Sequence, residues 1–188
     1  MRCFVAIELE PALHGAFARL LAESCSRDRE VSWCTPNQLH LTLKFLGEIE
    51  DTLLPRICEV VGAISASASV FHVRLTRLGC FPSPRAPRVL WCGVDDPASG
   101  CRRWVEAADP RFAELGIPRE ERTFTPHITL GRSKAPGGAR VMQRVLDAPA
   151  KLPDTPMEVR QVTVFESRLL PTGAQYRAVY TASLGTGA

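Results

Sequence analysis

The sequence has no long apolar run and little excess charge of either sign. None of its 188 residues belongs to an apolar stretch of about 18, the length that a membrane-spanning helix needs. The apolar start of the chain ends at Glu8, which makes it too short for the core of a signal peptide. With 23 basic and 20 acidic residues the net charge is only +3, which excludes a histone-like protein that coats nucleic acid but permits a local anion site.

Closely spaced cysteine pairs are also missing. The 7 cysteines are scattered along the chain, and no two lie within four positions of each other, which excludes zinc-ribbon and thioredoxin-like spacings. Scattered thiols without a disulfide framework are typical of a reducing compartment. The sequence therefore predicts a cytoplasmic protein that contacts no membrane, and it gives no sign of a structural metal.

Lysine is rare among the basic residues. Lys44, Lys134 and Lys151 are the only lysines, and all the other basic side chains are arginines. The arginine fork suits phosphate, but the same excess also follows from genomic base composition. Residues 119–144 carry six basic side chains against Glu120 and Glu121. This stretch either follows an RNA backbone or is an ordinary solvated face.

Length and hydrophobic patterning predict one globular α+β domain over residues 1–188, with a mainly antiparallel sheet. Alternating or continuous apolar patterns predict strands over 2–7, 39–45, 71–78, 88–94, 126–132, 159–166 and 175–181. Helical spacing predicts helices over 12–25, 51–64, 97–115 and 138–146. We expect Asp51 to cap the second helix, and a turn with Pro171 and Gly173 to join the last two strands.

One short pattern occurs twice. Thr35-Pro36 followed by His40-Leu41-Thr42-Leu43 returns as Thr125-Pro126-His127-Ile128-Thr129-Leu130. Alternate side chains of a strand share a face, so each copy presents an imidazole and a hydroxyl about 7 Å apart, with the apolar residues buried behind them. A single His-x-Thr on a strand means little, but this pair uses half of the 4 histidines. His14 and His72 have no matching context, and we expect no special role for them.

Two imidazoles and two hydroxyls in one sheet suit phosphodiester chemistry. In-line displacement at phosphorus needs one group to take a proton from the nucleophile and another to protonate the leaving oxygen, and histidine does both near neutral pH. The hydroxyls of Thr42 and Thr129 can donate to the phosphoryl oxygens, and Arg132 can add a charge-assisted bond. No carboxylate or cysteine joins either motif at ligand spacing, so we expect no metal and no cofactor.

The motifs and the segments around them resemble a known enzyme family. Paired His-x-Thr-x motifs mark the two-histidine phosphoesterase superfamily. The flanking segments are similar to its RNA 2′,3′-cyclic phosphodiesterase branch, historically called 2′-5′ RNA ligase. The similarity runs nearly from end to end, through residues 2–7, 40–48, 87–91, 124–132, 166–169 and 171–176.

The resemblance implies a bilobal fold with pseudo-two-fold symmetry, one motif in each lobe and both motifs in a central groove. It also implies metal-independent hydrolysis of RNA 2′,3′-cyclic phosphate ends to 2′-phosphomonoesters, together with a reversible 2′-5′ ligation. By this similarity His40 is the proton donor to the leaving 3′ oxygen and His127 accepts the proton of water. Thr42, Thr129 and Arg132 correspond to the phosphate-binding positions. The implied partners are RNA ends or oligonucleotides with a cyclic phosphate, and we expect a monomer.

Two other interpretations stay open at this point. The chain can act on a small cyclic nucleotide or a 2′-5′ oligonucleotide, because the loops that set substrate choice follow no pattern in the sequence. It can also be a non-catalytic module that binds RNA ends. Intact paired histidines argue against binding alone, because arginine and lysine suffice to hold phosphate.

Overall fold

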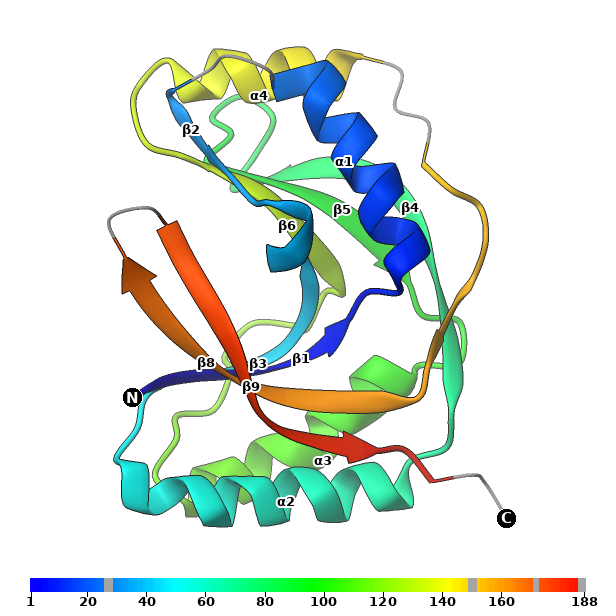
Figure 1. Ribbon diagram of the computed structural model, residues 1–188, viewed down its shortest axis with the longest axis vertical. Coiled ribbons are helices and arrows are strands. Elements are labelled where there is room, and N and C mark those ends of the chain that lie inside the picture. The colour runs from blue at the N-terminus through cyan, green and yellow to red at the C-terminus, as the bar shows by residue number, and fades with distance from the viewer. Residues whose placement is uncertain (26–28, 149–151, 171–172, 186–188) are drawn as a thin grey trace.

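The computed structural model describes residues 1–25, 29–148, 152–170 and 173–185 (Figure 1). The strands are β1 (Arg2–Glu8), β2 (Val31–Trp33), β3 (His40–Glu48), β4 (Phe71–Phe81), β5 (Val89–Asp95), β6 (His127–Ser133), β7 (Met157–Val159), β8 (Gln161–Leu170) and β9 (Gly173–Ser183). The α-helices are α1 (Pro11–Cys25), α2 (Leu54–Ser67), α3 (Gly100–Glu114) and α4 (Gly138–Asp147). Short 3-10 turns, η1 (Pro36–Gln38) and η2 (Asp51–Leu53), precede β3 and α2.

The strands form one curled sheet in the order β7-β4-β5-β6-β3-β1-β8-β9, and β2 pairs with the outer part of β6. Every pairing between named strands is antiparallel, so the predicted α+β class is confirmed. From the junction of β3 and β6 the order runs through β1, β8 and β9 on one side and through β5, β4 and β7 on the other. The two strands that carry the repeated motif therefore meet in the middle of the sheet.

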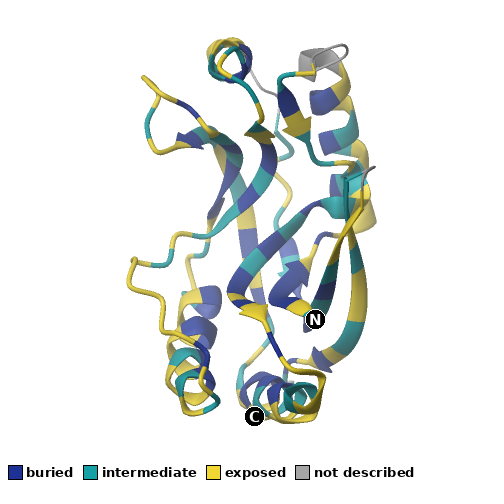
Figure 2. Cartoon of the chain, turned by 90° about the vertical axis from the view of Figure 1, so that its left-hand side faces the viewer, coloured by how far each residue is buried: buried dark blue, intermediate teal, exposed yellow. Residues whose placement is uncertain are grey.

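The helices lie at the two ends of the molecule, with α1 and α4 at one end and α2 and α3 at the other (Figure 1). Helix α2 contacts α3, β8 and β9, and it buries the apolar side chains of Ile57, Val61 and Ile64. Helices in Figure 2 are dark on one side and yellow on the other, as amphipathic surface helices are. The core thus lies between the helices and one face of the sheet, and the other face is left for the site.

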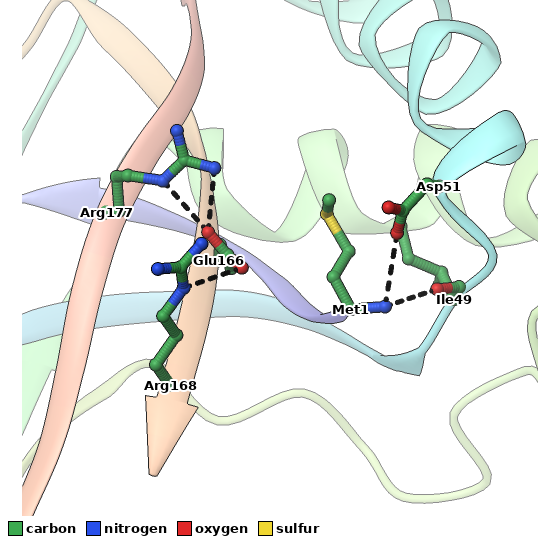
Figure 3. A network of polar contacts seen from close by, with 6 residues as sticks. All are labelled: Met1, Ile49, Asp51, Glu166, Arg168 and Arg177. Atoms are coloured by element: carbon green, nitrogen blue, oxygen red, sulfur yellow. Dashed lines mark hydrogen bonds and ion pairs between the residues drawn. The ribbon is translucent and has the colours of Figure 1, made fainter. Parts of the chain in front are cut away.

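Two helix starts differ from the sequence prediction. Asp51 does not cap α2, because η2 begins at this residue and α2 follows only at Leu54. The Asp51 carboxylate instead lies 3.5 Å from the amino group of Met1 (Figure 3). Helix α3 begins at Gly100, three residues later than expected, because the side chain of Asp96 accepts hydrogen bonds from Gly100 N (2.8 Å) and Cys101 N (2.9 Å). The first amides of a helix have no hydrogen-bond partner within the helix, and a side-chain oxygen commonly accepts from them in this way.

The C-terminal strands are longer than predicted, and a further short strand, β7, precedes them and pairs with β4. Gly173 opens β9, whereas Pro171 of the predicted turn lies outside the described residues. Glu166 of β8 is buried and forms ion pairs with Arg168 and Arg177 (Figure 3). Hydrogen bonds from Arg168 and Arg177 hold the pKa of the Glu166 carboxyl below its usual value.

The cysteines follow the prediction as far as the structure describes their side chains. Cys3, Cys34, Cys58, Cys80, Cys92 and Cys101 are free thiols, and four of them are buried. Burial raises the pKa of Cys3 to about 11 and that of Cys92 to about 12. These thiols are therefore protonated near neutral pH and pack as small apolar groups.

Candidate active site

The two motifs meet through a single residue pair at the β3–β6 junction. Leu41 pairs with Ile128, and both side chains are 0% exposed. Because neighbouring side chains of a strand point to opposite faces, the residues on both sides of this pair share the other face. These residues are His40 and Thr42 from β3 and His127 and Thr129 from β6. The structure thus brings together the four motif side chains that the sequence singled out.

Both motif strands have an extra residue at the same place in the motif, and β3 has a second one further on, at Leu46. In β3, Val5 of β1 pairs with Lys44 and Ala6 with Thr42, which leaves Leu43 without a partner. In β6, Gly131 pairs with Leu90 of β5 and Thr129 pairs with Trp91, which leaves Leu130 without a partner. Both are β-bulges, and each shifts the alternation by one residue.

The bulges decide which residues after the motif face the site. Strict alternation from His127 would turn Arg132 toward the core, but the bulge at Leu130 returns it to the face of Thr129. By the same shift Phe45 lies on the face of His40, where its ring centroid is 6.2 Å from that of Phe4. Arg132 and Phe45 are therefore equivalent positions with different chemistry.

The predicted strict alternation of residues 39–45 is wrong at Lys44 for the same reason. The bulge turns Lys44 into the core, where it is 6% exposed. Its Nζ donates to Asp109 Oδ1 at 2.5 Å and to the Pro118 carbonyl at 2.8 Å. Burial raises the pKa of Asp109, but hydrogen bonds from Lys44 and Glu120 N outweigh it, and the pKa lies below its usual value. The buried charge is thus paired and hydrogen-bonded.

The two imidazoles make the same hydrogen bond. Nδ1 of His40 lies 2.8 Å from the carbonyl oxygen of Gln38, and Nδ1 of His127 lies 2.8 Å from that of Thr125. A carbonyl only accepts, so Nδ1 carries the proton in both rings, and Nε2 is left to exchange protons. In both cases the acceptor comes two residues before the histidine. Because both hydrogen bonds go to backbone carbonyls, the pattern of side chains in the sequence could not predict them.

His40 lies in an aromatic surrounding. Its ring centroid is 4.7 Å from that of Phe4 and 5.2 Å from that of Tyr176, which approaches edge-on. Burial lowers the pKa of His40 to about 4; the Gln38 carbonyl opposes this shift, and the charges of Arg132 and His127 add to it. His40 is therefore neutral near pH 7 in the protein without substrate. Tyr176 was not singled out in the sequence, because its distance along the chain hides its contact with His40.

The remaining predicted site residues are accessible. Arg132 is exposed, and it is opposite Ser32 of β2 and Val89 of β5 in the sheet. Its charge acts on His40, Tyr176 and the Cys34 thiol, so it faces the other motif. Thr42 and Thr129 are half-buried.

In the described part of the chain, no group of three or more His, Cys, Asp or Glu side chains is close enough to hold a metal ion.

The basic stretch 119–144 does not form one surface. Arg119 and Arg122 line a hollow of about 410 Å³ beside α3, whereas Arg140 and Arg144 lie on α4 at the other end of the molecule. These four arginines therefore lie at separate places, and whether any part of the stretch follows an RNA backbone stays a prediction. His14 of α1 and His72 of β4 lie outside the two motifs; His72 is exposed and 3.8 Å from Glu158.

Comparison with known proteins agrees with the geometry of the two motifs. The model of the LigT-like phosphoesterase family matches residues 7–91 and again residues 93–176. The chain belongs to this family. Each match contains one motif, so the two copies in this LigT-like phosphoesterase correspond to the repeated unit of the family model.

Curated relatives of this LigT-like phosphoesterase cover nearly its whole length. The RNA 2′,3′-cyclic phosphodiesterase of Methanothermobacter thermautotrophicus is 32% identical over 178 residues, which are 94% of this chain and 95% of the relative. The protein of the same name from Thermotoga maritima is 28% identical over 96% of this chain and 94% of its own.

Solved structures of the same fold include TT0787 of Thermus thermophilus, which has a TM-score of 0.82 and is 29% identical in sequence. The match covers 100% of this chain and 99% of the TT0787 chain. LigT of Escherichia coli, solved with 3′-AMP, has a TM-score of 0.80 at 23% identity, with 97% of each chain covered. This second likeness concerns the fold alone. No helix in the described ranges is both long and apolar enough to cross a membrane.

Proposed function

We propose that this LigT-like phosphoesterase hydrolyses RNA 2′,3′-cyclic phosphate ends to 2′-phosphomonoesters by acid–base catalysis with two histidines. The observation that carries the proposal is the matched pair of imidazoles, each with Nδ1 bound to a backbone carbonyl and both on one sheet face. Two Nε2 atoms are then free to move one proton each. The names of the relatives in several organisms support the same activity.

The proposed reaction breaks the bond between phosphorus and the 3′ oxygen. A water molecule attacks phosphorus and loses a proton to one imidazole, while the other imidazole gives a proton to the departing 3′ oxygen. The product carries a 2′-phosphate and a 3′-hydroxyl. Family resemblance assigns the donor role to His40 and the acceptor role to His127.

The lowered pKa of His40 sets a condition for this assignment. His40 is neutral near pH 7 without substrate, but a donor must carry a proton. A bound phosphodiester anion opposes the charge of Arg132 and favours the protonated imidazole, so substrate binding raises this pKa. The proton of the acid is thus taken up together with the substrate.

Thr42, Thr129 and Arg132 are the proposed phosphate ligands. They share the sheet face of the histidines, and their donors can reach the non-bridging oxygens where negative charge collects. In this proposal the three side chains stabilise the charge of the transition state without a metal ion. We infer a metal-independent enzyme that acts as a monomer and a single domain over residues 1–188. The free thiols support a cytoplasmic location.

Product analysis on a short RNA with a 2′,3′-cyclic phosphate end tests the proposal. We expect a 2′-phosphomonoester as the sole product, at the same rate with and without a strong chelator. A 3′-phosphomonoester would contradict the assigned leaving oxygen, and loss of activity that a divalent ion restores would contradict the metal-free mechanism. Tight binding without turnover would favour a non-catalytic module that binds RNA ends. A marked preference for cyclic mononucleotides would favour a small-molecule substrate.

A further inference from the structure

Gln38 uses both its backbone and its side chain in the turn that leads to His40. It is the last residue of η1, and its backbone N donates to the Thr35 carbonyl oxygen at 2.8 Å. Its side-chain Oε1 accepts from Thr35 N at 2.7 Å. Its backbone carbonyl oxygen accepts from His40 Nδ1 at 2.8 Å. The orientation of the His40 ring therefore depends on where this one residue lies.

The remaining polar group of Gln38 reaches the C-terminal hairpin. Nε2 donates to the carbonyl oxygen of Ala174 in β9 at 2.5 Å, although the two residues are 136 positions apart in the chain. Two residues further along β9, the Tyr176 ring packs edge-on against the His40 ring, with 5.2 Å between the centroids. Strand β9 therefore contacts the His40 ring through Tyr176, and through Gln38 it holds the acceptor of that ring.

The turn that carries this acceptor is short and is held at both ends. η1 is a single 3-10 turn of three residues, a form with poorer hydrogen-bond geometry than an α-helix. Just before the turn, Cys34 N donates to the Leu130 carbonyl oxygen of β6 at 2.9 Å. At its end the Gln38 amide binds Ala174. The segment thus bridges the second motif strand and β9, and its last residue carries the acceptor for His40.

The second motif has the same acceptor but a different anchor. The carbonyl oxygen of Thr125 accepts from His127 Nδ1. The sheet itself holds the next residue, Pro126, because its carbonyl accepts from Val94 N of β5 at 3.1 Å. The Thr125 hydroxyl lies 3.5 Å from the Thr123 carbonyl of the same segment. Backbone pairing thus anchors the acceptor of the second motif, whereas an amide side chain anchors that of the first.

We propose that Gln38 is a positioning residue for His40, because its side-chain amide fastens the turn that carries the imidazole's acceptor to β9. The inference rests on the proposed function, in which His40 gives a proton to the departing 3′ oxygen. A displacement of about 1 Å that originates far from the reacting atoms can lower a rate about 100-fold. Loss of the amide releases the carbonyl, so the imidazole can turn and Nε2 loses its fixed direction.

Two substitutions of Gln38 separate its side-chain bonds. Gln38→Glu keeps an oxygen that accepts from Thr35 N, but at neutral pH it has no proton for the Ala174 carbonyl. Gln38→Met has a similar length and removes both bonds. Asn37→Ala is the matched control, since Asn37 is exposed in the same turn.

The first measurement is the turnover of a dinucleotide with a 2′,3′-cyclic phosphate. We expect both Gln38 variants to lower kcat about 10- to 100-fold with KM close to that of the wild type, because the proposed phosphate ligands are unchanged. Asn37→Ala should keep the wild-type kcat. Values are compared at the maximum of each pH profile, so that the charge of the new glutamate does not decide the result. Thermal unfolding verifies that each variant is folded.

The second measurement needs no turnover. Nitrogen chemical shifts of the imidazole rings show which ring nitrogen carries the proton when the ring is neutral. In the wild type we expect the proton on Nδ1 of both His40 and His127, since both bind a carbonyl. Both Gln38 variants should give a mixture of the two tautomers at His40 and leave His127 unchanged. A merely structural role of Gln38 would lower the unfolding temperature and leave the tautomer as it is.

Three results would overturn the positioning role. One is a wild-type kcat in Gln38→Glu, which would mean that the bond to Ala174 has no effect on His40. Another is a raised KM at an unchanged kcat, which would mean that Gln38 contacts the substrate. The third is an unchanged His40 tautomer in both folded variants. A wild type that has both Nδ1 tautomers and does not hydrolyse the cyclic phosphate would contradict the proposed function, while the tautomer of the variants still decides on Gln38.

Discussion

At the scale of single residues, the two histidines share one hydrogen bond and differ in their surroundings. Each Nδ1 is held by the carbonyl two positions earlier, which fixes the neutral tautomer. His40 is packed against Phe4 and Tyr176, and its burial keeps it uncharged. Chemically similar motifs thus hold their imidazoles by the same backbone bond, and the surroundings of His40 lower its pKa.

The lowered pKa of His40 predicts a loss of stability at mildly acidic pH. Between the ordinary value of 6.5 and about 4, the unfolded chain binds a proton that the folded protein does not. Stability from this group is complete above pH 6.5 and falls as the pH drops. His40→Gln should therefore reduce the difference in unfolding free energy between pH 7.5 and pH 5 by about 2 kcal/mol. Urea unfolding at both pH values measures it.

His14→Gln is the matched control for this experiment, since His14 lies on α1, outside the two motifs. This variant shows how far the loss of a histidine outside the motifs changes the pH dependence, and the change in His40→Gln is measured relative to it. The lowered pKa values of Asp109 and Glu166 act at lower pH, because the usual values of these carboxyls are 3.8 and 4.5. An unchanged pH dependence in His40→Gln would contradict a folded-state pKa near 4.

The threonines and Arg132 separate phosphate binding from a structural role. Valine keeps the shape of threonine and removes its donor, and a hydrogen bond to a charged group contributes about 1.5–3 kcal/mol. Thr42→Val and Thr129→Val should each lower kcat/KM on a dinucleotide with a cyclic phosphate about 10- to 150-fold, with folding intact. Arg132→Lys should lower kcat/KM less than Arg132→Ala does, because lysine keeps the positive charge and lacks only the planar fork of the guanidinium. Unchanged kcat/KM in both valine variants would contradict the proposed phosphate ligands.

At the scale of the elements, the bulges at Leu43 and Leu130 organise the site. They turn Phe45 and Arg132 outward, and in β3 they turn Lys44 inward onto Asp109. The chain after α3 is held by the same charge, since the Pro118 carbonyl accepts from Lys44. Strand β3 is therefore joined to the segment that leads toward His127.

Lys44→Met should destabilise the protein by about 3–5 kcal/mol, because it leaves the Asp109 carboxylate without its buried partner. The double variant Lys44→Met, Asp109→Leu should recover most of this loss, since it removes both charges. Urea unfolding of the two variants and the wild type tests the pair. A single variant as stable as the wild type would mean that water satisfies Asp109 and that the pair contributes little.

The sequence predicted which side chains of each motif share a face, but it did not predict the orientation of the residues after the motif. Alternation places His40 and Thr42 opposite Leu41, and the repeat identifies His127 and Thr129 by the same rule. The bulge after each motif has no local signal, because Leu43 and Leu130 are ordinary strand residues. Alternation therefore could not predict the burial of Lys44. Arg132 was placed at the phosphate by its position just past the motif and by the family resemblance, because alternation alone would turn it toward the core. The contact between Tyr176 and His40 likewise depends on tertiary structure. The hydrogen bonds of Asp96 to the first amides of α3 are local, but they were not predicted from the sequence.

At the scale of the whole molecule, the site depends on one junction between the two halves of the sheet. Within the described residues, only Leu41 and Ile128 pair across β3 and β6, and the motif side chains flank this pair. Helices cover the far ends, so the middle of the sheet is where both imidazoles can act on one phosphate. Because the two proposed proton transfers belong to one reaction, the effects of losing each histidine should not add.

The most direct test of paired-histidine catalysis is the turnover of His40→Ala, His127→Ala and the double variant on a dinucleotide with a 2′,3′-cyclic phosphate. We expect each single variant to lose about 10²- to 10⁴-fold in rate, since general acid–base catalysis contributes that much. The double variant should lose far less than the product of the two. Circular dichroism and thermal unfolding verify the fold of each protein. A folded single variant with wild-type turnover would contradict the account.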